Sequence, residues 1–469
     1  MRDISLRRVA KLTHGQLVCG HRKKHIPLAV SKIGRGSPAS ITFLSKPIVN
    51  ELNWLNLFSN HGVNCVMIKA GTRLDPDKWS RAGISIIEVP SLNRAYRELA
   101  TFYRAQFHIP LVQVIGSSGK TTTKEMIGSV LNENFPTLTS VQNMNSPNGV
   151  ANCLFNLNNT HRAAVVETGM KAAGIIRISS RMTRPDIGVI TSIHSAHLTR
   201  LGSIANIIDA KSEILEYLSP QGCLIINWDD PNCRRFPYQK YPGKLLRLGF
   251  SEQCDLWASN IRRHKFSTDF TAHTRKLRFN CRINILGRYN VSNALAAIAV
   301  GIKLGLTPDV ISQGLENFQA VGGRLKVYYQ NDGSIIIDDH FNANPDSTRL
   351  LVDELIIMAR EQPVALVIGD MERPSPDIES YARRVHFKIG RQLAQGEFEH
   401  ILAIGRWAWE YVRGAVQAGF PPDKISYFKT VQAAENSFVN LLNPGTTVVL
   451  KASPYTPLKD LLIENDIIS

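Results

Sequence analysis

The chain carries the stretch Gly116-Ser117-Ser118-Gly119-Lys120-Thr121-Thr122-Thr123, which decides how the rest of it is interpreted. The apolar run Leu111–Ile115 before it indicates a buried strand, and the apolar residues after it recur at helical spacing. A glycine-rich turn between a strand and a helix lets backbone N–H groups close around phosphate oxygens, and the helix N-terminus adds partial positive charge. The stretch therefore predicts a phosphate-binding loop.

The residue types in this loop point to ATP. Lys120 can reach the outer phosphates, and the Thr121 hydroxyl can bind a magnesium ion. Because position 114 is Val, the pattern is a shorter Gly-x-x-Gly-Lys-Thr form of the usual motif. The alternative is a chance Gly/Ser turn, which the strand and helix on either side disfavour. We expect the nucleotide to contact Gly116, Ser118, Gly119, Lys120, Thr121 and Thr122.

Length and composition limit the class of protein. At ~100–200 residues per domain, 469 residues predict two to four domains. The composition, 43% hydrophobic and 20% charged, is that of a globular protein. No apolar run is long enough to span a membrane, and the N-terminus lacks the apolar core of a signal peptide, so we expect a cytoplasmic location.

The net charge of +16 raises the possibility of nucleic-acid binding, but the basic residues are dispersed and their short clusters lack interleaved aromatics. A nucleotide or a polyanionic small substrate would also favour a basic surface. The seven cysteines form no Cys-x-x-Cys pair, which favours reduced, buried thiols over zinc ligands. We therefore expect no nucleic-acid partner, and we expect a monomer.

The chain divides into three predicted units, all of the α/β class. Residues 1–106 form a small α/β domain, and residues 107–320 form the nucleotide domain, where alternating strands and helices predict a mostly parallel sheet. Within that domain, residues 255–285 alternate in short runs that indicate an antiparallel extension. Residues 321–469 predict a second doubly wound, Rossmann-like sheet.

Several further segments fall at strand ends and helix starts, where α/β enzymes build their sites. In chain order they are Asn143–Val150, Val165–Met170, Ser195–Leu198, Ala210–Glu213, Gly287–Ala294, Gly323–Leu325, Asp338–Ser347 and Gly369–Glu372. Their order and residue patterns resemble those of the Mur ligase family, and within it the MurF group, whose members add D-alanyl-D-alanine to UDP-N-acetylmuramoyl-tripeptide. The resemblance covers most of residues 96–450.

The resemblance implies an ATP- and Mg²⁺-dependent ligase that joins a carboxylate to an amine through an acyl phosphate in peptidoglycan synthesis. Thr121 and Glu167 would hold the first Mg²⁺, while His197 and a carbamylated Lys211 would support a second. Asn290 and Asn293 match residues that contact the adenine. Arg324 matches an arginine at the γ-phosphate, and Asp339 matches an acid that holds the ribose. Lys120, His197, Lys211 and Arg324 would then be the catalytic residues.

Each of these residues also has a purely structural interpretation. Lys211 could be a solvated helix lysine, His197 a core histidine, and Glu167 a helix cap. Asn290 and Asn293 could serve as helix N-caps. The presence of Lys120, Thr121, Glu167, His197 and Lys211 together favours an enzyme over a non-catalytic ATP-binding relative, since a binding module needs no two-metal set.

The substrate regions depart from the family pattern. The Asp-Ser-Arg and Phe-Val-Ala-x-x-Gly segments that hold the UDP-sugar are missing near residues 30–44, and the usual Lys-Gly-Ser-Arg becomes Lys451-Ala452-Ser453-Pro454. Pro-Gly-Arg becomes Gly322-Gly323-Arg324, a departure that ATP binding tolerates. Two hypotheses for the small-molecule acid and amine stay open: a UDP-linked cell-wall precursor with an amino acid or dipeptide, or another pair in a specialised pathway.

Overall fold

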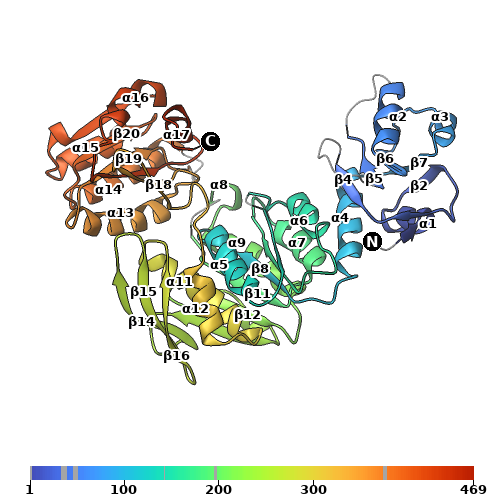
Figure 1. Cartoon of the computed structure of the whole chain (residues 1–469), viewed down its shortest axis with the longest axis horizontal. Helices are drawn as coiled ribbons and strands as arrows, with labels where there is room; N and C mark the ends of the chain where they lie inside the picture. The colour runs from blue at the N-terminus through green and yellow to red at the C-terminus, as the bar shows by residue number, and fades with distance from the viewer. Residues whose placement is uncertain are drawn as a thin grey trace.

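The structure is a computed structural model that describes residues 3–32, 40–45, 51–141, 143–194, 198–372 and 378–468. Three α/β units follow one another along the chain, as Figure 1 shows in blue, green to yellow, and orange to red. The predicted α/β fold class is confirmed. Within the described part of the chain, no helix combines the length and apolarity that crossing a bilayer requires.

The N-terminal unit has a sheet in the order β2-β7-β6-β5-β4, in which only β2 runs antiparallel to its neighbour. A separate antiparallel pair, β1 with β3, lies beside it. Its elements are β1 (Asp3–Ser5), α1 (Leu6–Leu12), β2 (Gln16–Cys19), β3 (His25–Pro27), β4 (Val30–Lys32), β5 (Ile41–Phe43), α2 (Glu51–Asn60), β6 (Cys65–Lys69), α3 (Pro76–Arg81), β7 (Ser85–Val89) and α4 (Leu92–Arg104).

Helix α4 joins this unit to the next one. Its buried residues, Ala95, Tyr96, Leu99 and Ala100, recur at helical spacing and pack on both units. At its end the Arg104 guanidinium donates to the carbonyl oxygens of Thr183 (3.2 Å), Phe107 and Ile109 (3.0 Å). The connecting helix is therefore fixed to the central unit by apolar packing and by a buried cation.

The central unit has a sheet in the order β16-β15-β14-β13-β12-β11-β8-β10-β9. From β9 to β14 in this order, each strand runs parallel to its neighbour. Strands β15 and β16 then pair antiparallel beyond β14, and together with β14 they form the antiparallel extension predicted for residues 255–285. The strands are β8 (Leu111–Ile115), β9 (Thr137–Thr139), β10 (Ala163–Glu167), β11 (Ile187–Ile190), β12 (Cys223–Asn227), β13 (Lys244–Gly249), β14 (Leu256–Arg263), β15 (Thr268–Thr274) and β16 (Arg278–Ile283).

Helices cover this sheet because its strands are apolar on both faces. Helices α5 and α11 pack on one face, and α6 and α7 lie on the other, beside α4 (Figure 1). The helices are α5 (Lys120–Asn132), α6 (Pro147–Leu154), α7 (Ile175–Thr183), α8 (Leu198–Leu201), α9 (Ile204–Ser212), η1 (Glu213–Glu216), α10 (Pro231–Arg234), η2 (Tyr238–Lys240), α11 (Arg288–Lys303) and α12 (Pro308–Glu316).

The C-terminal unit has a sheet in the order β17-β18-β22-β19-β20-β21, parallel except for β17. This matches the predicted second doubly wound sheet. Its elements are β17 (Lys326–Tyr329), β18 (Ile335–Asp339), α13 (Pro345–Ala359), β19 (Val364–Gly369), α14 (Ile378–Leu393), β20 (His400–Ile404), α15 (Trp409–Gln417), η3 (Pro422–Lys424), β21 (Ile425–Phe428), α16 (Val431–Val439), β22 (Thr447–Lys451) and α17 (Lys459–Glu464).

Candidate active site

The predicted phosphate loop lies between β8 and α5, at the carboxyl edge of the central sheet. Gly119 is the N-cap residue of α5 and has no side chain with which to cap the first turn. The backbone N–H groups of that turn therefore keep their capacity to bind an anion, and the helix dipole favours negative charge there. This is the geometry expected of a nucleotide phosphate site.

Two glycines of the loop are required by its shape. Gly116 has a φ of 155°, and a Cβ there would lie 2.0 Å from the Thr191 hydroxyl. Gly119 has a φ of 78°, and a Cβ there would lie 2.7 Å from Asn293 Oδ1. Any larger residue would push the loop away from the neighbouring strand end and helix.

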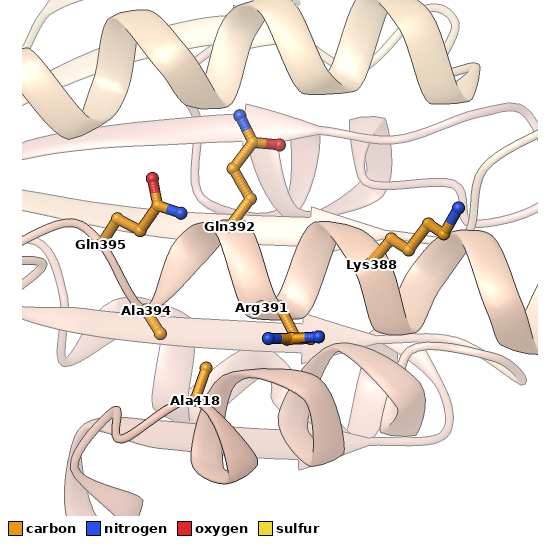
Figure 2. A pocket seen from close by; sticks show the side chains of 6 residues that line it. All are labelled: Lys388, Arg391, Gln392, Ala394, Gln395 and Ala418. Carbon is orange, nitrogen blue, oxygen red and sulfur yellow. The ribbon is translucent and has the colours of Figure 1, made fainter.

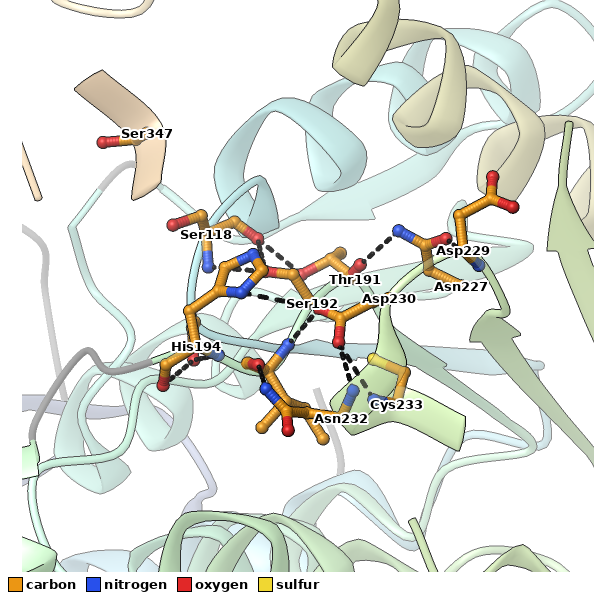
Figure 3. A network of polar contacts seen from close by, with 12 residues as sticks. Ser118, Thr191, Ser192, His194, Asn227, Asp229, Asp230, Asn232, Cys233 and Ser347 are labelled. Carbon is orange, nitrogen blue, oxygen red and sulfur yellow. Dashed lines mark hydrogen bonds and ion pairs between the residues drawn. The ribbon is translucent and has the colours of Figure 1, made fainter. Parts of the chain in front are cut away.

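The end of β11 holds the loop in place, as Figure 3 shows. The Ser118 N–H donates to Ser192 Oγ (3.0 Å), and Thr191 Oγ1 donates to the Ser118 carbonyl (2.6 Å). Asp230 fixes this strand end in turn, because its Oδ2 accepts the Ile193 N–H (2.8 Å). Asp230, Thr191 and Ser192 lie outside the motif segments, so the sequence motifs did not predict them, although they lie at the same sheet edge.

Lys120 folds back across the loop, where its Nζ donates to the Ser117 carbonyl (3.1 Å). Desolvation is the main cause that lowers the pKa of Lys120, and the nearby Arg324 lowers it further, while Glu167 and Glu372 act in the opposite direction. A cation held in partly desolvated surroundings gains most from a bound polyanion. Lys120 is therefore placed to neutralise phosphate oxygens.

Glu167 ends β10 beside the loop and is buried. Its Oε2 accepts a hydrogen bond from Thr121 Oγ1 (2.8 Å), and its Oε1 accepts one from Asn145 Nδ2 (2.9 Å). These bonds give Glu167 no helix-capping role. Among the described residues, no three His, Cys, Asp or Glu side chains gather as a metal cage. The Thr121–Glu167 pair instead offers the few hard oxygen donors with which Mg²⁺ joins a nucleotide phosphate.

Lys211, on α9, is only 1% exposed, so it is not a solvated helix lysine. Its Nζ makes no hydrogen bond or ion pair with any described residue. Burial lowers the pKa of Lys211 to about 7, with a further contribution from Lys120. A substantial share of this amine is therefore neutral and nucleophilic near neutral pH. His197, its predicted companion, lies outside the described residues.

Asn290 and Asn293 lie in the first turns of α11, against the phosphate-loop helix. Asn293 Oδ1 accepts from Thr123 Oγ1 (3.0 Å), and its Nδ2 donates to Asn290 Oδ1 (2.9 Å). Asn290 Nδ2 donates to the Leu286 carbonyl (2.5 Å). Neither side chain accepts a first-turn N–H, so the alternative role as helix N-caps is wrong. The chain of bonds orients both amides beside the loop.

The C-terminal unit contributes to the same region. Asn344 Nδ2 donates to Ser118 Oγ of the phosphate loop (3.2 Å), and the Asn344 side chain also caps α13. The Arg324 guanidinium lies 4.3 Å from the centroid of the Phe341 ring. Its Nε is buried and has no hydrogen-bond partner among the described residues. An unpaired buried donor of this kind is unfavourable until a ligand oxygen reaches it.

Asp339 is buried at the end of β18 and pairs with Lys451 of the adjacent β22, Nζ to Oδ2 at 2.5 Å. Lys451 Nζ also donates to the Asn342 carbonyl (2.8 Å). The predicted ribose-binding acid therefore already has a cationic partner. In the sequence, Lys451 stands out only as part of a motif that departs from the family pattern, and the structure adds it to the candidate site.

A cavity of about 400 Å³ lies elsewhere, on the outer side of the C-terminal unit between α14 and α15 (Figure 2). Its rim carries Lys388, Arg391, Gln392 and Gln395. Gln392 Nε2 is already engaged, since it donates to the Arg349 carbonyl (3.0 Å) and to Asp353 Oδ1 (2.6 Å). None of the residues of the phosphate-loop site lines this cavity, so it is not part of that site.

Comparisons with known proteins identify the family and the fold. A model of the Mur ligase middle domain matches residues 114–301, and a model of the Mur ligase glutamate ligase domain matches residues 323–454. UDP-N-acetylmuramoyl-tripeptide–D-alanyl-D-alanine ligase of Escherichia coli is 32% identical over 315 residues, which are 66% of this chain and 68% of the relative.

Solved structures show the same architecture. The crystal structure of MurF from Acinetobacter baumannii superposes with a TM-score of 0.84 at 27% identity, and 99% of each chain is covered. MurF ligase from Thermotoga maritima, crystallised in complex with ADP, superposes with a TM-score of 0.77 over 93% of this chain and 97% of that one; at 20% identity it supports the fold alone. The chain therefore belongs to the Mur ligase family of ATP-dependent, amide bond-forming ligases.

Proposed function

We propose that this ligase uses ATP to join D-alanyl-D-alanine to UDP-N-acetylmuramoyl-tripeptide, the reaction named for its Escherichia coli relative. One observation carries the proposal. The uncapped N-terminus of α5 lies beside Lys120 and the Thr121–Glu167 pair, and the C-terminal unit touches the loop through Asn344. ATP would thus be held between two units, and closure of such units commits substrates to reaction.

In this proposal the nucleotide lies along the contact between the central and C-terminal units. The loop N–H groups and Lys120 hold the outer phosphates, while Asn290 and Asn293 face the adenine. Arg324 reaches the γ-phosphate with its unpaired Nε. Asp339, positioned by Lys451, accepts from the ribose hydroxyls. These donors would stabilise the charge that develops on the transferring phosphoryl group.

Magnesium fits the Thr121–Glu167 pair, since both side chains offer hard oxygen donors next to the phosphate loop. When bound there, Mg²⁺ supplies positive charge that neutralises the phosphate oxygens. Asn145 orients the Glu167 carboxylate through its hydrogen bond to Oε1. The second metal expected from the resemblance would rest on His197 and Lys211, of which only Lys211 is described.

Lys211 is proposed to react with carbon dioxide as a carbamate. The neutral amine attacks the carbon of CO₂, an N–C bond forms, and one proton leaves. The product is an anion, which removes the repulsion between two nearby cations, Lys211 and Lys120. The buried position without a partner and the pKa lowered to about 7 support this assignment.

The ligation itself has two proposed steps. A carboxylate oxygen of the acid substrate attacks the γ-phosphorus of ATP, and the bond to the β-phosphate oxygen breaks, which gives an acyl phosphate and ADP. The amine nitrogen then attacks the acyl carbon, loses a proton, and expels phosphate. Lys120 and Arg324 bind the phosphoryl oxygens through the first step, and exclusion of water by the closed units protects the acyl phosphate from hydrolysis.

A second candidate is the same chemistry on a different acid and amine. It is favoured by Lys451-Ala452-Ser453-Pro454, where the family has an arginine in place of Pro454. Here Ser453 Oγ donates to the Asp370 carbonyl (2.6 Å), so this turn serves the fold and presents no guanidinium to a substrate. Of the diverged segment near residues 30–44, residues 33–39 lie outside the described residues.

The domain boundaries remain part of the proposal. The expected limits at 106/107 and 320/321 fall in the connections between α4 and β8 and between α12 and β17. We propose that residues 1–106 bind the acid substrate and that residues 321–469 close over ATP and bring the amine. A monomer in the cytoplasm is the expected state.

The deciding experiment measures ADP and phosphate release with the acid and the amine supplied singly and together. The proposal predicts release of both products only when UDP-N-acetylmuramoyl-tripeptide and D-alanyl-D-alanine are present together, with the amide product found by mass spectrometry. Turnover with another acid–amine pair, and none with this one, would favour the second candidate. No turnover with any pair would contradict both.

A further inference from the structure

A second basic pocket, of about 230 Å³, lies between α4 and α7, where the connecting helix of the N-terminal unit meets the central unit. Its polar wall carries Arg94 and Arg97 from α4 and Arg177 and Arg181 from α7. Ile178 and Met182 add apolar surface to it. We call it the arginine pocket; the phosphate-loop site shares no residue with it.

Three of the four arginines already have carboxylate partners. Arg181 Nη2 lies 2.9 Å from Glu98 Oε2, and Arg94 Nε lies 3.9 Å from the same carboxylate. Arg177 binds both carboxylate oxygens of Glu216 through its Nε (3.0 and 2.8 Å). These pairs hold the pocket wall in a defined shape.

Arg97 is the exception. Among the described residues it forms no ion pair, and the hydrogen bond from its Nη1 goes to Asn148 Oδ1 at a long 3.4 Å. Its side chain is half-buried, and this burial lowers the pKa of its guanidinium. A guanidinium carries five N–H donors in a planar fork that matches carboxylate and phosphate oxygens. A half-buried fork with most of its donors unused is the feature of an oxyanion site.

The position of the arginine pocket relates it to the reaction. Asn148, which contacts Arg97, lies in the first turn of α6, three residues after Asn145, and Asn145 binds Glu167 beside the phosphate loop. The helices that carry the pocket, α4 and α7, lie on the side of the central unit that faces the N-terminal unit (Figure 1). In the proposed function that unit binds the acid substrate.

We propose that the arginine pocket binds an oxyanion of the acid substrate, a carboxylate or a phosphate, through Arg97. This inference rests on the proposed function for the identity of the substrate. The bound oxyanion would pair with Arg97, and the part of the substrate next to it would lie against Ile178 and Met182. It would position the acid substrate without touching the reacting carboxylate, so Arg97 is a positioning residue.

The test compares Arg97→Ala with Arg162→Ala in steady-state kinetics. Arg162 is an exposed arginine directly before β10, and its Nη1 donates to the Asn159 carbonyl (2.9 Å). Loss of a charge-assisted hydrogen bond should raise the KM for the acid substrate by about 10- to 100-fold. The KM for ATP and kcat should stay within a few-fold, and Arg97→Lys should recover part of the loss. An unchanged KM for the acid in a folded Arg97→Ala protein would overturn the inference.

Calorimetry distinguishes the two sources of the oxyanion. The probes are UDP and the phosphate-free N-acetylmuramoyl-tripeptide. If Arg97→Ala weakens only UDP binding, the pocket holds a phosphate; if it weakens only binding of the peptide, the pocket holds a carboxylate. Unchanged affinity for both probes would refute the site.

The proposed substrate can be wrong even if the arginine pocket binds an oxyanion. If the wild type forms no ADP with this acid, the pocket is tested with inorganic phosphate and with citrate, by thermal shift. Stabilisation of the wild type and of Arg162→Ala, but not of Arg97→Ala, would keep the oxyanion site. Equal shifts in all three proteins would refute it.

Discussion

Helices α5 and α9 each bury a lysine, and the two lysines have opposite surroundings. Lys124 on α5 donates to the Ser140 carbonyl (2.5 Å) and pairs with Glu125 (2.6 Å). Lys211 on α9 is equally withdrawn from solvent but has no partner among the described residues, and burial lowers its pKa to about 7. Burial alone therefore does not distinguish a structural lysine from a reactive one, whereas the absence of compensating contacts does.

The largest expected effect comes from a third lysine of the same region, Lys120. Lys120→Ala removes a cation aimed at the phosphate charge, and losses of ~10²–10³ in rate are typical of one lost electrostatic contact. The measurement is ADP release at saturating ATP, with circular dichroism as the check on folding. Near-normal turnover of Lys120→Ala would contradict the assignment of residues 116–123 as the phosphate-binding loop.

Lys211→Ala should lower turnover by about 10- to 100-fold, the range typical of groups that support a metal site. Short-chain carboxylates such as acetate should restore part of the activity to this variant, because they replace the missing carbamate anion. Lys124→Ala is the matched control, and its activity should not respond to acetate. Full activity of Lys211→Ala without any addition would show that the lysine is dispensable.

Thermal stability should separate the same two lysines in opposite directions. Lys124→Met leaves the Ser140 carbonyl without its donor and should destabilise the protein by about 1–3 kcal/mol. Lys211→Met removes an amine whose ammonium form is disfavoured in the fold, so at pH 6 it should raise Tm. This gain in Tm over the wild type should shrink as the pH rises, because protonation of Lys211 is linked to folding.

The unfolded chain keeps the Lys211 proton up to its ordinary pKa of 10.5, whereas the folded chain releases it near 7. Between these values the unfolded state binds more protons, so the wild type gains stability as the pH rises through this window, and Lys211→Met does not. Melting curves at pH 6 and pH 9 in CO₂-depleted buffer measure the difference. A lowered Tm in both variants at both pH values would contradict the contrast.

The local part of the site could be predicted from the sequence, because β8, the loop and α5 are contiguous and their chemistry is contained in one stretch. Contacts between distant segments could not. Asp339 and Lys451 are 112 residues apart and meet only because β18 and β22 are neighbours in register. The contact of Asn344 with Ser118 depends on how two units pack. Lys211 carries no local signal of burial, since most helix lysines are solvated.

The smallest expected effect concerns the substrate side, where the sequence departs most from the family. Because the Asp-Ser-Arg segment is missing, we expect binding of the acid substrate to depend less on its UDP group than in a standard MurF. Calorimetry with UDP-N-acetylmuramoyl-tripeptide and its nucleotide-free analogue should give affinities within about tenfold, less than one charge-assisted hydrogen bond to a phosphate often contributes. Tight binding that vanishes without UDP would show that other residues recognise the uridine diphosphate.

The comparison of the two lysines is tested most directly by ¹³C NMR of the protein in ¹³C-labelled bicarbonate. A carbamate gives its own carbon signal, which no unlabelled group obscures. We predict one such signal in the wild type, growing as the pH rises through 7, retained in Lys124→Met and absent in Lys211→Met. A wild type without this signal, or a signal that survives in Lys211→Met, would contradict the claim that the lysine without a partner is the one that reacts.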